Sequence, residues 1–162
     1  GSVGDEHSMT AIGDVALLKD GRYAVAHGGD PERVSVFSAD GKKVEFVGTK
    51  GSGPGEFRAI VSVRAAATGL AVVDAQLRRT SILDASWKHL RSSPIAGEML
   101  DRPIVLPNGR LLMNSLVRSS SNFGFVLHTI NDSGAVVQSF DEPPGGIRFD
   151  MPGELYFRAL SL

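Results

Sequence analysis

Cysteine is absent from the 162-residue sequence, which excludes disulfide bonds, a thiolate metal site and a cysteine nucleophile. Long apolar runs are missing too. The longest candidate, Ile60–Ala67, is interrupted by Ser62 and Arg64, whereas a membrane-spanning helix needs about 18 apolar residues or more. The formal net charge is only −1, so no broad basic surface is available for nucleic acid or anionic lipid. We therefore expect no nucleic-acid partner and no membrane span.

A convincing amphipathic helix is also missing. The segment Leu70–Leu83 has some helix formers, but it contains β-branched residues such as Val72 and Val73, which favour strands. The 19 glycines and 8 prolines do not gather in a linker but punctuate the chain at short intervals. This distribution is typical of many short strands joined by tight turns. The sequence therefore predicts an all-β fold.

The turn signals recur with a regular spacing. Turn glycines lie 48, 40 and 44 residues apart, at Gly21, Gly69, Gly109 and Gly153. Apolar stretches flank the first three of these turns, which is the pattern of a β-hairpin. A second hairpin with alternating apolar and polar residues follows in each of these units. A repeat of about 40–50 residues with two hairpins is typical of a four-stranded propeller blade.

Each unit also shows a gradient of polarity. The first two strands are more uniformly apolar, and the later two alternate, as expected from the buried inner to the wet outer part of a propeller blade. We therefore predict β-propeller blades of four antiparallel strands. The predicted units cover about residues 11–50 (blade 1), 58–93 (blade 2) and 100–141 (blade 3), and residues 145–162 begin a partial blade 4.

Three segments carry a family resemblance. Asp20–His27 matches a glycine turn followed by an apolar strand, and Arg33–Gly41 matches a segment Arg-Ile-x-Val-Phe-Asp with its Asp-Gly turn. Gly51–Phe57, which reads Gly-Ser-Gly-Pro-Gly-Glu-Phe, is the most specific match. In these segments the chain resembles the NHL-like six-bladed β-propellers of bacteria. The resemblance implies an open arc or a fragment of a six-bladed ring, in a secreted or periplasmic protein.

The length of the chain raises the question of ring closure. A six-bladed ring with blades of about 40–50 residues needs about twice as many residues as this chain provides. An open arc leaves two apolar blade faces uncovered. Either the chain is an excerpt of a longer protein, or two copies associate through their exposed blade faces. We expect the excerpt, because the sequence stops shortly after a hairpin-like start at Ile147–Leu162.

The glycine-rich segment between blades 1 and 2 has a structural interpretation. It lacks the residue order of a phosphate-binding loop, and no helical sequence follows it. We expect its glycines and proline to form a rigid crossing from the outer edge of one blade to the inner edge of the next, and its phenylalanine to be buried between the blades. The motif residues are Gly51, Gly53, Pro54, Gly55, Glu56 and Phe57.

Polar residues end the second strand of each unit and form the candidate binding positions at the channel mouth. These are His27, Asp74 and, in the third unit, Asn114 or Ser115. An arginine follows in two units, Arg33 after His27 and Arg79 after Asp74. One interpretation is a ring of polar groups around the channel. The other, which we favour for Asp74 and Arg79, is a salt bridge or hydrogen bond that closes the loop between the second and third strands. We predict that Asp74 lies within salt-bridge distance of Arg79 or Arg78. We predict no catalytic residue and no metal site, because no histidine pair has ligand spacing.

Two classes of function remain open. The resemblance favours a non-catalytic binding scaffold without a cofactor, whose ring face binds a protein, peptide or glycan. The alternative is a hydrolase or lactonase-like enzyme with a divalent cation such as calcium in the channel. Calcium needs several oxygen ligands, and Asp74 and Asn114 are the contributors that can be named. Fold similarity does not decide between them; we expect the scaffold.

Overall fold

The described part of the chain is built from β-strands only. The computed structural model describes residues 11–95, 98–99, 103–106, 110–116 and 127–140. These ranges contain fifteen strands and no helix, and therefore no helix that could cross a membrane. The all-β prediction is confirmed.

The first sheet, blade 1, has four antiparallel strands in the order of the sequence. Alanine and valine side chains on one face of this sheet, such as Ala16, Ala24 and Val36, are buried. They belong to the core shared with the next sheet. The strands are β1 (Ile12–Leu17), β2 (Tyr23–His27), β3 (Val34–Phe37) and β4 (Val44–Val47).

The second sheet, blade 2, repeats this topology with four antiparallel strands. The repeat extends to an irregularity in the first hairpin. The register shifts between Ile12 and Asp14 in blade 1 and between Ile60 and Ser62 in blade 2. The strands are β7 (Ile60–Ala65), β8 (Gly69–Asp74), β9 (Arg79–Asp84) and β10 (His89–Pro94).

The third sheet, blade 3, differs in its first strand. Two short segments, β11 (Glu98–Met99) and β12 (Ile104–Val105), both pair antiparallel with β13 (Leu111–Leu116). The sheet continues through β14 (Leu127–Ile130) to β15 (Val136–Phe140). The predicted partial blade at residues 145–162 lies outside the described residues.

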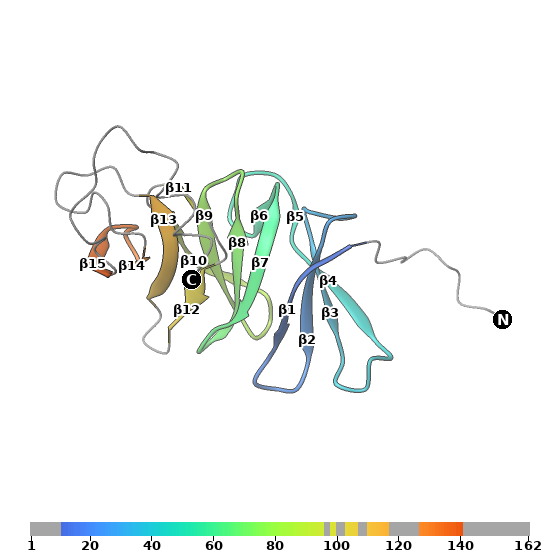
Figure 1. Cartoon of the computed structure of the whole chain (residues 1–162). Helices are drawn as coiled ribbons and strands as arrows, with labels where there is room; N and C mark the ends of the chain where they lie inside the picture. The colour runs from blue at the N-terminus through green and yellow to red at the C-terminus, as the bar shows by residue number, and fades with distance from the viewer. Residues whose placement is uncertain (1–10, 96–97, 100–102, 107–109, 117–126, 141–162) are drawn as a thin grey trace.

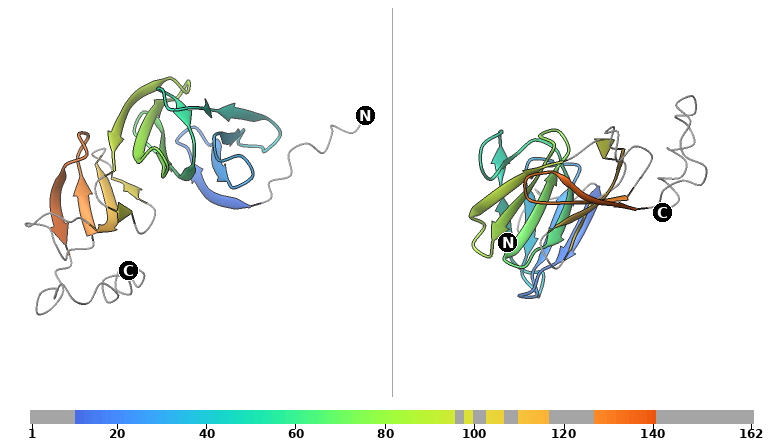
Figure 2. Two further views of the ribbon diagram at one scale, coloured as in Figure 1. Left: turned by 90° about the horizontal axis from the view of Figure 1, so that it is seen from above. Right: turned by 90° about the vertical axis from the view of Figure 1, so that its left-hand side faces the viewer.

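The three sheets stand side by side like the blades of a propeller (Figure 1). Seen from above, they follow one another in an arc, and the described residues do not form a closed ring (Figure 2). The first strands of blades 1 and 2, β1 and β7, are in contact. The chain therefore repeats one sheet and packs each copy on the previous one.

Separate apolar cores join consecutive blades. The core between blades 1 and 2 includes Val34 and Val36 from one sheet and Val63 and Leu70 from the other. The core between blades 2 and 3 joins Val73 to side chains of blade 3, among them Leu111, Met113 and Ile130. Burial between blades, rather than within one sheet, therefore stabilises the fold.

Phe57 fills the junction between blades 1 and 2. Its side chain is completely buried within their shared core. A β-carbon on Gly48, at the end of blade 1, would lie only 2.5 Å from the Phe57 ring. Thr49–Lys50 (β5) and Glu56–Phe57 (β6) form a short parallel pair that closes the connection between the blades. The predicted burial of Phe57 between the two blades is confirmed.

Candidate functional site

Asp74 ends β8 and is completely buried. One carboxylate oxygen, Oδ2, accepts a hydrogen bond from the Arg58 amide at 2.7 Å, and Oδ1 accepts one from the Leu77 amide at 2.8 Å. Both oxygens therefore bind main-chain groups of two loops at the same end of blade 2, one before β7 and one after β8. The predicted salt bridge of Asp74 to Arg79 or Arg78 is wrong, because no ion pair of Asp74 is found among the described residues and the Arg79 guanidinium reaches the connecting loop. The predicted hydrogen bond that closes the loop after this strand is present, with the Leu77 amide as donor.

Arg79 holds the connecting loop between blades 1 and 2. Its guanidinium donates hydrogen bonds to three carbonyl oxygens, at 2.9 Å to Ser52, 2.7 Å to Gly53 and 2.7 Å to Glu56. An arginine fork suits this task because it carries several donors in a fixed plane. The recurring arginine is therefore a loop clamp in blade 2.

The glycine motif shapes the loop that Arg79 holds. Glu56 Oε2 accepts a hydrogen bond from the Gly53 amide at 2.7 Å. The same carboxylate occupies the space that a β-carbon on Gly51 would need, so a larger residue would push it away from its partner. The motif thus builds a compact connection, as its structural interpretation proposes.

His27 and Arg33 are the counterparts of Asp74 and Arg79 in blade 1, because His27 pairs with Ile12 as Asp74 pairs with Ile60. His27 is half-buried, and its Nε2 lies 3.1 Å from the Ser35 hydroxyl. Its Nδ1 is buried without a hydrogen-bond partner. No hydrogen bond or ion pair among the described residues joins His27 to Asp74.

In blade 3 the strand register separates Asn114 from Ser115. Leu111 and Met113 face blade 2, just as Leu70 and Val72 of blade 2 face blade 1. Ser115 lies two residues beyond Met113 and therefore holds the register position of Asp74. Asn114 belongs to the opposite face of the sheet and is buried.

An acidic residue on the first strand of blade 1 was not singled out by the sequence analysis. Asp14 Oδ2 accepts hydrogen bonds from the Ser62 hydroxyl at 2.7 Å and the Val63 amide at 3.0 Å. It also forms an ion pair with Arg64. These contacts join the first strands of blades 1 and 2. The described residues contain no group of three or more side chains suited to hold a metal ion.

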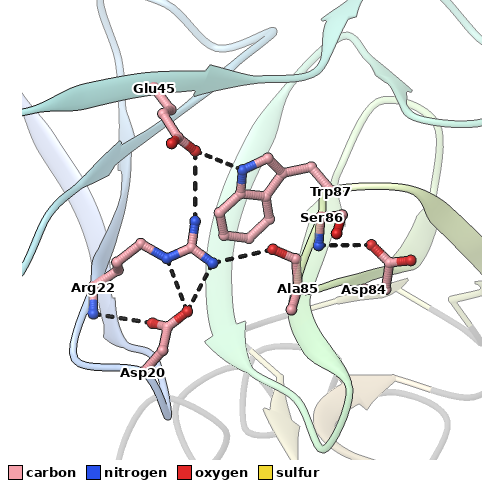
Figure 3. A network of polar contacts seen from close by, with 7 residues as sticks. All are labelled: Asp20, Arg22, Glu45, Asp84, Ala85, Ser86 and Trp87. Carbon is pink, nitrogen blue, oxygen red and sulfur yellow. Dashed lines mark hydrogen bonds and ion pairs between the residues drawn. The ribbon is translucent and has the colours of Figure 1, made fainter.

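A second polar group missed by the sequence analysis joins the rims of blades 1 and 2 (Figure 3). We call it the Arg22–Trp87 cluster; it comprises Asp20, Arg22, Glu45 and Trp87. Arg22 lies over the indole ring at 4.2 Å from its centroid and pairs with Asp20 at 2.7 Å. Glu45 Oε2 accepts a hydrogen bond from the indole nitrogen at 2.8 Å. Arg22 also donates to the carbonyl oxygen of Ala85 at 3.1 Å.

Trp87 adopts a backbone conformation that usually requires glycine. Its φ is 67°, and the equivalent turn positions of the other blades are Gly41 (71°) and Gly134 (80°). In each turn this residue donates its amide hydrogen to the carbonyl three residues earlier. A left-handed conformation costs a side-chain-bearing residue about 1–2 kcal/mol. The contacts of the cluster must offset that cost. The signal in the sequence was the single tryptophan at the place of a turn glycine.

The cluster also sets the local electrostatics. The side-chain hydrogen bond from Arg22, followed by a bond from the Arg22 amide, lowers the pKa of the Asp20 carboxyl below its usual value. The Asp20 and Glu45 side chains remain largely exposed, whereas Arg22 is mostly covered. The rim therefore presents two carboxylates beside an aromatic ring.

Similarity to solved structures supports the fold of the chain alone. No family model matches the chain, and no curated protein matches its sequence. Among solved structures, it is similar to a Bacteroides fragilis protein named as an exported protein, with a TM-score of 0.69 and 18% identity over 88% of this chain and 40% of that one. It is also similar to a protein of unknown function from Bacteroides caccae, with a TM-score of 0.52 and 12% identity over 82% of this chain and 46% of that one. The chain thus spans less than half the length of either bacterial protein, and it shares with them an all-β fold.

Proposed function

We propose that the chain is part of an NHL-like β-propeller of the six-bladed type that serves as a non-catalytic binding scaffold for a protein, peptide or glycan. The repeated four-stranded sheets and the Gly51–Phe57 connection support the family. The similarity to a protein named as exported supports a secreted or periplasmic location.

The hydrogen bonding of Asp74 carries the choice of a scaffold over a metal enzyme. The alternative needs Asp74 as an oxygen ligand of a divalent cation in the channel. Both of its oxygens accept amide hydrogens at 2.7 and 2.8 Å, and the residue is buried. A cation would have to reach a completely buried carboxylate whose two oxygens are already held by charge-assisted hydrogen bonds, which are stronger than neutral ones. Asp74 therefore acts as a structural residue that joins two loops at one end of blade 2.

Thermal melting with calcium chloride and with a chelator tests this proposal. A cation that binds the folded state raises Tm in proportion to the logarithm of its concentration above Kd. For a scaffold we expect the same Tm in both conditions. A saturable rise with calcium would contradict the scaffold and favour the cation-dependent hydrolase or lactonase-like enzyme.

Arrays of immobilised glycans and peptides test the binding function itself. We expect at least one class of probe to bind saturably. Asp20→Asn and Glu45→Gln serve as control variants in these assays. Both remove negative charge from the exposed rim of the Arg22–Trp87 cluster while preserving side-chain size. Absence of binding across both arrays would contradict a peptide- or glycan-binding scaffold.

A further inference from the structure

The outermost strand of blade 2, β10, contains one residue more than its partner β9 at a single point. His89 and Arg91 lie opposite two consecutive residues of β9, Leu83 and Ile82. Leu90, between them, therefore has no residue of β9 across from it. Two residues that face one are the geometry of a β-bulge. The side chain of Leu90 is 48% exposed, so the extra residue is an apolar one that lies in solvent.

The outermost strand of blade 3, β15, has the same irregularity at the same place. Val137 is the extra residue there, because Val136 and Gln138 lie opposite consecutive residues of β14. Val137 is 45% exposed. It lies three residues after the turn position of Gly134, and Leu90 lies three residues after the equivalent turn position of blade 2. The repeat therefore includes the bulge, and in both blades the extra residue is apolar and exposed.

The outermost strand of blade 1 differs, because β4 pairs with β3 from Val44 to Val47 without a register shift. This strand has four residues, whereas β10 has six and β15 has five. The exposed residues Lys42 and Lys43 precede it, and Gly48 in a left-handed conformation follows it. A short strand and flanking lysines are other features that keep a sheet edge from pairing. The bulge thus occurs on the two longer edges.

The outer side of β10 is an unpaired edge within the described part of the chain. β10 is the last strand of its sheet, and no other described strand pairs with it. Its residues Leu90, Ser92 and Pro94 are exposed. An edge strand of this kind offers N–H and C=O groups to a strand of another molecule. The bulge interrupts that row of groups and increases the local twist, and Pro94 has no N–H to donate. Both features oppose the addition of a further strand.

We propose that the bulge at Leu90 keeps the outer edge of blade 2 from pairing with the same edge of a second copy of this chain. A regular β10 would be self-complementary, because two antiparallel copies related by a twofold axis present the same residues to each other. The bulge leaves one residue of the sheet without a cross-strand partner. Protection of the edge explains why this irregularity recurs on the longer edges. This inference does not depend on the proposed binding function.

Deletion of Leu90 from the 162-residue chain tests the proposal. The deletion removes only the extra residue, so His89 and Arg91 keep their partners in β9 and their faces of the sheet. In sedimentation equilibrium we expect the deletion variant to associate about tenfold or more tightly than the parent chain, because it offers a continuous edge for several cross-strand pairs. Leu90→Ala is the matched control. It retains the bulge and should associate like the parent chain.

Hydrogen exchange distinguishes edge pairing from association through any other surface. Association should protect the β10 amides in the deletion variant and not in the parent chain. Deletion of Val137 is the second variant and should have the same effect at β15. The proposal is overturned if the deletion variants associate no more tightly than the parent, if the amides of the altered strand gain no protection, or if Leu90→Ala acts like the deletion. Circular dichroism monitors folding. Unfolding of both deletion variants would also overturn the proposal, because the bulge would then be required by the sheet itself.

Discussion

Blade 1 and blade 2 present the same face of the same repeat to different surroundings. In blade 2 this face carries completely buried valines, a carboxylate with two amide partners and an arginine that binds three carbonyls. In blade 1 the equivalent face carries exposed apolar side chains, a half-buried histidine and an arginine paired within its own loop. The difference shows that a residue's role in a repeat depends on the neighbouring blade.

The comparison is tested most strongly at the aromatic residues. Phe57→Ala should lower the free energy of unfolding by about 3–5 kcal/mol, because it leaves a cavity between two blades. Phe46→Ala, on the equivalent face of blade 1, should lower it by about 1 kcal/mol or less, since the ring is 40% exposed and surface substitutions have small effects. Urea denaturation measures both. Equal effects would contradict the distinction between covered and open faces.

The acceptors at the end of the second strand give the next largest contrast. Asp74→Ala leaves two partly buried main-chain amides without their acceptor, so we expect a loss of about 2–4 kcal/mol. His27→Ala, at the equivalent position of blade 1, should cost about 1 kcal/mol, because it removes a single hydrogen bond, between Nε2 and the Ser35 hydroxyl. Chemical denaturation compares the two variants. A larger effect at His27 would reverse our assignment of the structural position.

The two arginines should differ in the same sense. Arg79→Lys removes the planar fork that reaches three carbonyl oxygens, and we expect a loss of about 1–2 kcal/mol. Arg33→Lys preserves the charge beside Asp30 in an exposed ion pair, which is worth about 0–1 kcal/mol in total. Hydrogen exchange of the Gly51–Phe57 amides adds a local readout, and it should accelerate only in the Arg79 variant.

Trp87 and Gly41 hold the same position in two equivalent turns. Trp87 contacts the neighbouring blade, whereas a β-carbon on Gly41 would meet nothing within 4 Å. Trp87→Gly relieves about 1–2 kcal/mol of backbone strain but removes a partly buried ring and its cation–π contact, worth roughly 2–4 kcal/mol together. We expect a net loss of about 1 kcal/mol in thermal melting. Gly41→Ala adds strain without a new contact and should cost about 1 kcal/mol. A stabilised Trp87→Gly variant would show that the cluster does not join the blades.

The smallest effect is expected from the acid dependence of Asp20. Arg22 lowers the pKa of this carboxyl in the folded protein. Its contribution to stability is therefore present above the unfolded-state pKa and is lost as the pH falls through the folded-state pKa. Asp20→Asn should be slightly less stable than the parent at neutral pH and equally stable in strong acid. Asp40, in the turn that contains Gly41, serves as a comparison for Asp20. Its pKa is lowered mainly by the Ser38 hydroxyl, a group of the same turn.

Much of the fold followed from local patterns in the sequence. The spacing of turn glycines and the alternation of apolar residues predicted consecutive antiparallel sheets, because hairpins form between neighbouring segments and depend on short-range geometry. The same reasoning predicted the position of Phe57, since a rigid glycine and proline segment between two blades directs the large apolar residue that follows it into the core between them. It could not foresee that the first strand of blade 3 is split into β11 and β12.

The candidate site was less predictable. Asp74 and Arg79 were paired from their positions in the sequence, and they are indeed neighbours in the register, but each side chain binds main-chain groups of a loop instead. The Arg22–Trp87 cluster joins a turn of blade 1, a strand of blade 1 and a turn of blade 2, so no local pattern could announce it.

The sequence by itself therefore determined the strands, their hairpins and the repeat, because these depend on backbone preferences and on contacts between residues close along the chain. Only the tertiary structure decided which of the equivalent residues binds a loop, which joins two blades and which remains exposed. Those roles depend on donors and acceptors that a different blade supplies, across separations such as the 42 residues between Glu45 and Trp87.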